Sequence, residues 1–180
     1  MTLVTCERLS DRNYIITSDK YATGWHTMVE NMNKVLKLSG NVYISIAWRH
    51  IPDTTLQAAY THVYGKEKIS SVNFIKFAEY IKDTYCEWKY LIDMLVITHN
   101  ECMIIEWPAC SIMWEDNPFF SIGSWYLYAK SIYEYEKQCE NQVNYWVMYY
   151  TINQRLDPKI SKEFNLLEIN FNNKWLKNNS

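Results

Sequence analysis

The most specific pattern in the sequence is SIMWEDNPFFSIGSWYLYA, residues 111–129, and the predicted fold and function depend on it. It holds two tryptophans, Trp114 and Trp125, with Glu115 beside the first and Gly123 shortly before the second. An aromatic next to an acid is commonly a core ring beside a solvated carboxylate. It can also bind a flat, charged ring by stacking on its face and accepting hydrogen bonds from its edge. The rest of the sequence has to decide between these two interpretations.

Composition limits the classes of protein. The chain has 180 residues, 48% hydrophobic, 16% aromatic and 21% charged, which is typical of one folded globular domain. The net charge of −2 and the lack of a long Lys/Arg run exclude a protein that binds long nucleic acid along its backbone. The frequent Asn, Lys, Ile and Tyr residues favour an AT-rich genome, such as that of a large virus or a protist.

The cysteines and the apolar runs predict the compartment. Five scattered cysteines without a C-x-x-C pair indicate reduced thiols rather than a disulfide framework. No apolar run approaches the ~18 residues of a membrane-spanning helix, and the start lacks the apolar core of a signal peptide. We therefore expect a cytoplasmic protein with no membrane contact, and we separately expect it to be a monomer.

Hydrophobic periodicity predicts most of the elements. Apolar spacing indicates a helix from Trp25 to Leu36, and alternation indicates a strand over 42–48. A second helix follows Ser70-Ser71, and the runs 90–97 and 102–107 predict a hairpin.

The second half is predicted in the same way. Residues 55–65 fit either a loop or an edge strand, and 124–129 fit a strand. The capping-box pattern Ser131-x-x-Glu134 opens a long amphipathic helix that runs to Tyr150, and the chain ends in a strand pair.

These elements predict an α+β fold, a curved antiparallel sheet with two to three helices packed on its convex face. We expect one domain over residues 1–180. It would comprise an N-terminal extension with a helix at 1–40 and a core at 42–177.

Several enzyme classes are weakly supported. The four histidines share no ligand spacing with each other or with the cysteines, so we expect no metal, and nothing indicates a cofactor. Pro52-Asp53 and Glu87-x-Lys89 can be fitted to the pattern of a metal-dependent nuclease, but such loosely spaced residues arise by chance. No Gly-rich phosphate loop is present.

The pattern Met113-Trp114-Glu115-Asp116 followed by Gly123-x-Trp125 resembles the cap-binding family of eukaryotic translation initiation factor 4E. Four flanking stretches resemble family elements in the same order: 55–63, 70–81, 144–150 and 166–171. The chain would thus be a divergent, viral or cellular member of that family.

The resemblance implies a site for the 7-methylguanosine cap. Trp114 would stack on one face of the cationic guanine, and Tyr60 would take the place of the second stacking aromatic. Glu115 would accept hydrogen bonds from the guanine edge. The triphosphate would be bound by lysines near the C-terminus: Lys174, Lys177 and Lys162.

The resemblance also implies partners and a role without catalysis. The ligand would be capped mRNA, and a scaffold similar to initiation factor 4G would dock as a helix on the helical face. The residues of that docking groove would be Val72, Ile75, Val147 and Met148. The function would be RNA binding in translation initiation, that is, in protein biosynthesis. The alternatives are a non-enzymatic viral or host interaction module without cap binding and, third, a metal-dependent nuclease.

Overall fold

The computed structural model describes residues 2–23, 28–29, 32–38, 42–47, 51–64, 71–85, 93–98, 102–106, 111–113 and 118–171. The chain forms two compact units. The first unit comprises Met1–Asn33 and Asp116–Ser180, and the second comprises Lys34–Glu115. No helix among these residues is long and apolar enough to cross a membrane.

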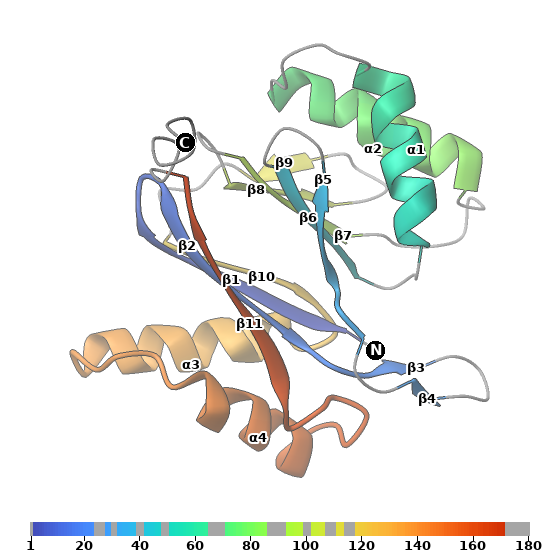
Figure 1. Cartoon of the computed structure of the whole chain (residues 1–180). Helices are drawn as coiled ribbons and strands as arrows, with labels where there is room; N and C mark the ends of the chain where they lie inside the picture. Colours follow the sequence, from blue (N-terminus) through green and yellow to red (C-terminus); the bar gives the residue numbers. More distant parts are fainter. Residues whose placement is uncertain are drawn as a thin grey trace, which may run out of the picture. The chain divides into compact units, whose positions relative to one another are not determined.

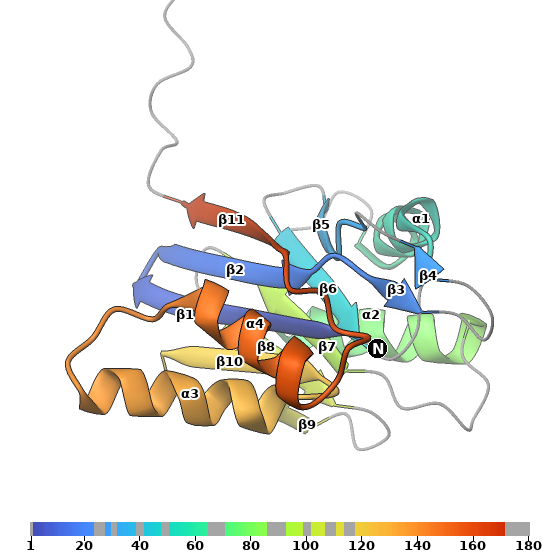
Figure 2. The same ribbon diagram turned by 90° about the horizontal axis from the view of Figure 1, so that it is seen from below.

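The first unit is built on a four-stranded antiparallel sheet with the order β10-β1-β2-β11. Helices α3 and α4 cover one face of this sheet (Figures 1 and 2). Two short strands, β3 and β4, follow β2 in the sequence and pair with each other. The elements are β1 (Leu3–Ser10), β2 (Asn13–Asp19), β3 (Ala22–Thr23), β4 (Met28–Val29), β10 (Phe119–Gly123), α3 (Tyr126–Gln138), α4 (Tyr145–Arg155) and β11 (Phe164–Asn170).

The core of the first unit lies between the sheet and its two helices. Leu3 and Phe119 from the strands pack with residues that recur at helical spacing on α3 and α4. The helical members are Ala129, Tyr133, Tyr145, Met148, Tyr149 and Ile152. On the opposite face of β1, Val4 and Cys6 are also fully buried, so the first part of this strand shows no alternation of buried and exposed residues.

The second unit pairs a five-stranded antiparallel sheet, ordered β5-β6-β7-β8-β9, with two helices. Helices α1 and α2 lie side by side (Figure 1), and their apolar faces share one core with the sheet. The elements are β5 (Val35–Leu38), β6 (Val42–Ala47), α1 (Asp53–Tyr64), α2 (Ser71–Tyr85), β7 (Asp93–Ile97), β8 (Cys102–Glu106) and β9 (Ser111–Met113).

The predicted single curved sheet is wrong. The described strands form two main sheets, each with its own pair of helices and its own core. The strands of the first sheet come from both ends of the chain, because β1 pairs with β10 and β2 pairs with β11. Whether the two units make up one domain stays a prediction.

The predicted helix from Trp25 to Leu36 is also wrong. Residues Met28–Val29 and Val35–Leu38 are strands, and β5 pairs with β6 from Val35↔Ser45 to Leu38↔Val42. Short apolar runs fit either period, and here pairing between strands decides the outcome. Nothing is described for residues 24–27 and 30–31, within the same span.

The predicted long helix is two helices. A Schellman motif ends α3: Asn141 N donates to Glu136 O at 2.9 Å and Glu140 N donates to Lys137 O at 3.0 Å. Glu140 takes the left-handed conformation with φ 58° that this motif requires. At its other end α3 begins at Tyr126, so Ser131 lies inside the helix. Most of the strand predicted over 124–129 is instead the start of α3.

Candidate functional site

The start of β1 brings several polar groups to one place. Thr2 comes immediately before the strand, and both atoms of the peptide group that joins it to Leu3 are hydrogen bonded. Its carbonyl oxygen accepts from Ser124 N at 2.9 Å, and Leu3 N donates to Asp19 Oδ1 at 2.8 Å. This peptide plane is therefore fixed on both sides.

Asp19 is a fully buried carboxylate at the end of β2. A buried charge is costly unless it is hydrogen bonded, and backbone N–H groups are strong partners for it. Besides the Leu3 amide, Asp19 accepts from Tyr21 N at 3.3 Å through Oδ2. The antiparallel register, with Val4 opposite Ser18, brings the carboxylate beside the first residue of β1.

Gly123 allows this close approach. It pairs with Leu3 at the end of β10 and has φ 98°, which side chains of L-residues rarely allow. A Cβ atom at this position would collide with the Thr2 carbonyl oxygen. Only glycine therefore fits here without displacing Thr2 or the strand.

Ser124 has a second property besides its backbone contact with Thr2. Its side-chain oxygen is buried, and no hydrogen-bond partner for it lies within the described part of the chain. Buried hydroxyls normally have a partner, and an exception calls for an explanation. The oxygen belongs to the same residue whose amide contacts Thr2, so it is a candidate acceptor for a ligand or a chain terminus there.

Behind Leu3 lies a row of buried hydroxyls. Thr5 and Thr17 face each other across β1 and β2, with their Oγ1 atoms 2.6 Å apart. Thr17 Oγ1 is 3.1 Å from the Tyr149 hydroxyl, which donates to Leu3 O at 3.4 Å. Burial raises the pKa of Tyr149, so this phenol remains a neutral donor.

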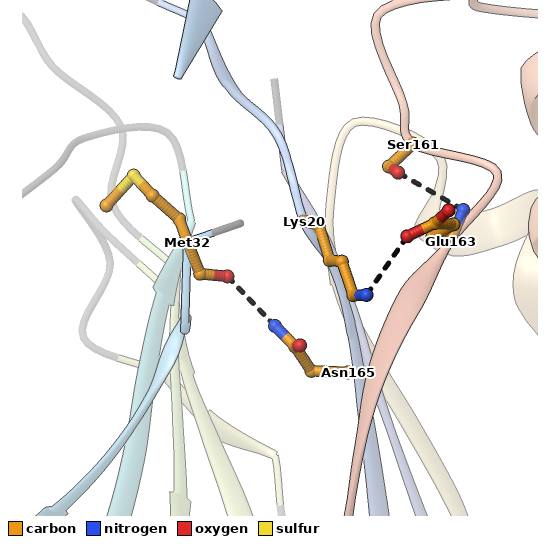
Figure 3. Close-up of polar contacts among 5 residues, drawn as sticks. All are labelled: Lys20, Met32, Ser161, Glu163 and Asn165. Atoms are coloured by element: carbon orange, nitrogen blue, oxygen red, sulfur yellow. Dashed lines mark hydrogen bonds and ion pairs between the residues drawn. The ribbon is translucent and has the colours of Figure 1, made fainter. Parts of the chain in front are cut away.

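The strand β11 fixes the segment that follows β2 (Figure 3). Asn165 Nδ2 donates to Met32 O at 2.9 Å, and Met32 N donates to Lys20 O at 3.0 Å. Lys20 forms an ion pair with Glu163 at 3.1 Å, and Glu163 N donates to Ser161 Oγ at 3.1 Å. These contacts hold the backbone just beyond Asp19.

Of the residues predicted to bind the cap guanine, only Tyr60 belongs to the described structure. Tyr60 is only 3% exposed in α1, where it packs against Tyr64 and Phe77. Trp114 and Glu115 lie outside the described residues, as do the remaining members of the phosphate set, Lys174 and Lys177.

Lys162 and the predicted docking groove are described in part. Lys162 is exposed, with its Nζ 6.0 Å from the centre of the Tyr150 ring. Val147 is exposed on α4, whereas Met148 is fully buried in the core and cannot line a groove. Val72 and Ile75 belong to α2, but their side chains lie outside the described residues.

Within the described ranges, no three His, Cys, Asp or Glu side chains form a group that could hold a metal ion.

Comparison with solved structures shows that the fold is similar to that of HslV and of BPH. HslV from Trypanosoma brucei matches with a TM-score of 0.71 at 12% identity, over 93% of this chain and 99% of that chain. BPH from Thiobacillus denitrificans matches with a TM-score of 0.70 at 13% identity, over 93% and 97% of the two chains. The same BPH in complex with epoxomicin matches with a TM-score of 0.66 at 13% identity, over 93% of this chain and 98% of that chain. No protein-family model and no curated protein sequence matches the chain.

These matches overturn the assignment to the initiation factor 4E family. The cap-binding function in translation, the capped mRNA and 4G-like partners and the non-enzymatic role depended on that assignment, and they are corrected with it. The expected monomeric state is corrected as well. The alternatives, an interaction module and a nuclease, do not fit this fold either.

No pattern in the sequence predicted a role for Thr2, Asp19 or Ser124. One signal could have revealed the hairpin that positions the first two. Residues 10–13, Ser-Asp-Arg-Asn, are typical of a turn, and they separate two apolar runs that become β1 and β2.

Proposed function

We propose that this chain is a hydrolase of the N-terminal-nucleophile type that cleaves peptide bonds, with Thr2 as its nucleophile. The observation that carries the proposal is the fixed position of Thr2, whose peptide group is held by Ser124 and by the buried Asp19. The fold supports it, because the similar HslV and BPH structures are proteasome-type peptidase subunits, and one of them holds the inhibitor epoxomicin.

An N-terminal threonine supplies both a nucleophile and a base. The Thr2 Oγ1 atom attacks the carbonyl carbon of the substrate peptide bond, while its proton passes to the free Thr2 amine. The C–N bond then breaks, the leaving amine takes that proton, and the acyl group remains as an ester on Oγ1. Water attacks the ester, gives a proton to the amine and later to Oγ1, and releases the acid.

This chemistry requires a free amine on Thr2, so the peptide bond before Thr2 must first be cleaved. The buried Ser124 hydroxyl, which has no partner among the described residues, is suited to accept a hydrogen bond from that amine. Such a bond would orient the lone pair of the amine toward Thr2 Oγ1.

The proposal is tested with fluorogenic peptides and with Thr2→Ala and Thr2→Ser. We expect Thr2→Ala to lose cleavage and Thr2→Ser to keep part of it, and intact mass should show that the active chain begins at residue 2. Thr61→Ala is the matched control, because Thr61 is exposed and its hydroxyl only bonds its own helix at Gln57 O. Equal cleavage by wild type and Thr2→Ala would overturn the proposal.

We also propose a cytoplasmic location. Cys139 is an exposed free thiol, which suits a reducing compartment.

A further inference from the structure

Leu3 connects Thr2 to the sheet, and both of its backbone polar groups are held by buried side chains. Its N–H donates to Asp19 Oδ1 at 2.8 Å, and its carbonyl accepts from the Tyr149 hydroxyl at 3.4 Å. Leu3 is itself fully buried. The Leu3 N–H belongs to the peptide group that Leu3 shares with Thr2, and the Leu3 carbonyl belongs to the next one. The contact at the carbonyl therefore acts on Thr2 through the orientation of Leu3.

The Tyr149 hydroxyl is held in turn by Thr17 and Thr5. The distances are 3.1 Å from Tyr149 to Thr17 and 2.6 Å from Thr17 to Thr5, and all three side chains are fully buried. If Tyr149 donates to Leu3, Thr17 can donate to Tyr149 and Thr5 to Thr17. In this direction every hydroxyl of the row has an acceptor, and the row ends on the Leu3 carbonyl.

The Tyr149 ring is fixed as firmly as its hydroxyl. It stacks on Phe164, the first residue of β11, with ring centres 5.0 Å apart and planes at 21°. Tyr149 therefore joins α4 to the ends of β1, β2 and β11. A core ring packed in this way has little freedom to follow a displaced Leu3.

We infer that Tyr149 is a positioning residue for Thr2, acting through the Leu3 carbonyl with the support of Thr17 and Thr5. This inference rests on the proposed function. A catalytic group must be held close to its productive geometry, and a displacement of about 1 Å can cost about 100-fold in rate.

The test compares Tyr149→Phe with Tyr145→Phe. Each change removes one buried phenol oxygen from α4, but the Tyr145 hydroxyl donates to Glu7 and not to Leu3. We expect Tyr149→Phe to lower kcat about 10- to 100-fold with little change in KM, whereas Tyr145→Phe keeps the wild-type kcat. Equal effects of the two variants on kcat would overturn the inference.

Thr17 gives a second pair of variants. Thr17→Val removes the hydroxyl that orients Tyr149, and Thr17→Ser keeps it. We expect Thr17→Val to lower kcat in the same direction as Tyr149→Phe and Thr17→Ser to restore it. A Thr17→Ser variant as slow as Thr17→Val would show that packing, not the hydroxyl, is responsible.

Amide hydrogen exchange at Leu3 and Val4 tests the inference without using activity. We expect faster exchange in Tyr149→Phe than in wild type and no change in Tyr145→Phe. If wild type cleaves no peptide but this exchange difference is present, the proposed function is wrong and the positioning contact is real. If wild type cleaves peptides and neither exchange nor kcat responds to Tyr149→Phe, the positioning role is wrong.

Discussion

Asp19 is a fully buried carboxylate whose two oxygens both face backbone N–H groups, those of Leu3 and Tyr21. In Asp19→Asn an NH₂ group replaces one carboxylate oxygen, so a hydrogen-bond donor then faces a backbone N–H group, which is also a donor. We expect the free energy of unfolding to fall by about 1–3 kcal/mol in a urea titration, because a buried donor loses its acceptor. Asp11→Asn is the control, since that side chain is 95% exposed, and a shift of equal size there would contradict the argument.

Gly123 presents a steric problem rather than an electrostatic one. In Gly123→Ala the new Cβ would collide with the Thr2 carbonyl oxygen, and φ 98° would be strained for alanine. The strain alone costs about 1–2 kcal/mol, so we expect a lower melting temperature and loss of peptide cleavage. Ser131→Ala, on the exposed side of α3, should change neither quantity. Wild-type cleavage by Gly123→Ala would show that Thr2 does not need this close approach.

At the scale of elements, Glu7 ties both helices of the first unit to β1. Its Oε2 accepts from the Tyr145 hydroxyl of α4 at 2.5 Å, and its Oε1 pairs with Lys137 Nζ of α3 at 2.9 Å. The carboxylate is buried, so these charge-assisted bonds are little weakened by water.

Replacing this carboxylate should loosen the helices. We expect Glu7→Gln to lower the free energy of unfolding by about 1–3 kcal/mol, because a charged acceptor is lost at a buried position. Glu163→Gln is the matched control: it removes the exposed Lys20 pair and should cost about 0–1 kcal/mol. Chemical denaturation of the two variants measures both changes. Equal losses in the free energy of unfolding would contradict the anchoring role of Glu7.

Local pattern predicted elements whose own residues carry a clear helical or alternating period, wherever their partners lie in the sequence. The helix after Ser70, the strand from Val42 and the hairpin of β7 and β8 are confirmed, as is a strand at β11. The capping-box start at Ser131 is wrong because α3 already begins at Tyr126, and a Schellman motif ends that helix before Tyr150. The helix from Trp25 is wrong because strand pairing decided that segment.

The candidate site lay beyond this kind of prediction. Thr2, Asp19 and Ser124 meet only because β1 pairs with β2 on one side and with β10 on the other. The second pairing joins residues about 120 positions apart, and no periodicity in the sequence encodes it. Gly123 was recognised as part of a motif, but its contact with Thr2 was not.

For the whole molecule, the matches to HslV and BPH show that the fold persists at 12–13% identity. Few specific residues are then needed to define the fold, since many core sequences of suitable volume and patterning can pack the same elements. A short motif such as that of residues 113–125 carries correspondingly little information about the fold. Its resemblance to the initiation factor 4E family is a local likeness between different architectures.

Buried tyrosines in both units predict how the stability of the molecule depends on pH. Burial raises the pKa of four of them: Tyr64, Tyr133, Tyr145 and Tyr149. For Tyr133 burial, with a smaller contribution from Glu7, raises the pKa to about 12. Below a pH of about 10 these phenols are protonated in the folded and the unfolded chain alike, so they cause no change in stability there. Above it the unfolded chain releases protons that the folded chain retains, and the free energy of unfolding must fall as pH rises.

The expected slope is about 1.4 kcal/mol per pH unit for each tyrosine that ionises only on unfolding. This slope is measured by urea unfolding of wild type and Tyr64→Phe between about pH 9 and pH 11, a range that brackets the ordinary tyrosine pKa. The free energy of unfolding of Tyr64→Phe should fall less steeply with pH than that of wild type, because the variant lacks one phenol whose pKa burial raises. Parallel slopes would show that Tyr64 ionises as readily in the folded chain as in the unfolded one. Such a result would place its hydroxyl in contact with water rather than in the core that Tyr64 shares with Tyr60 and Phe77.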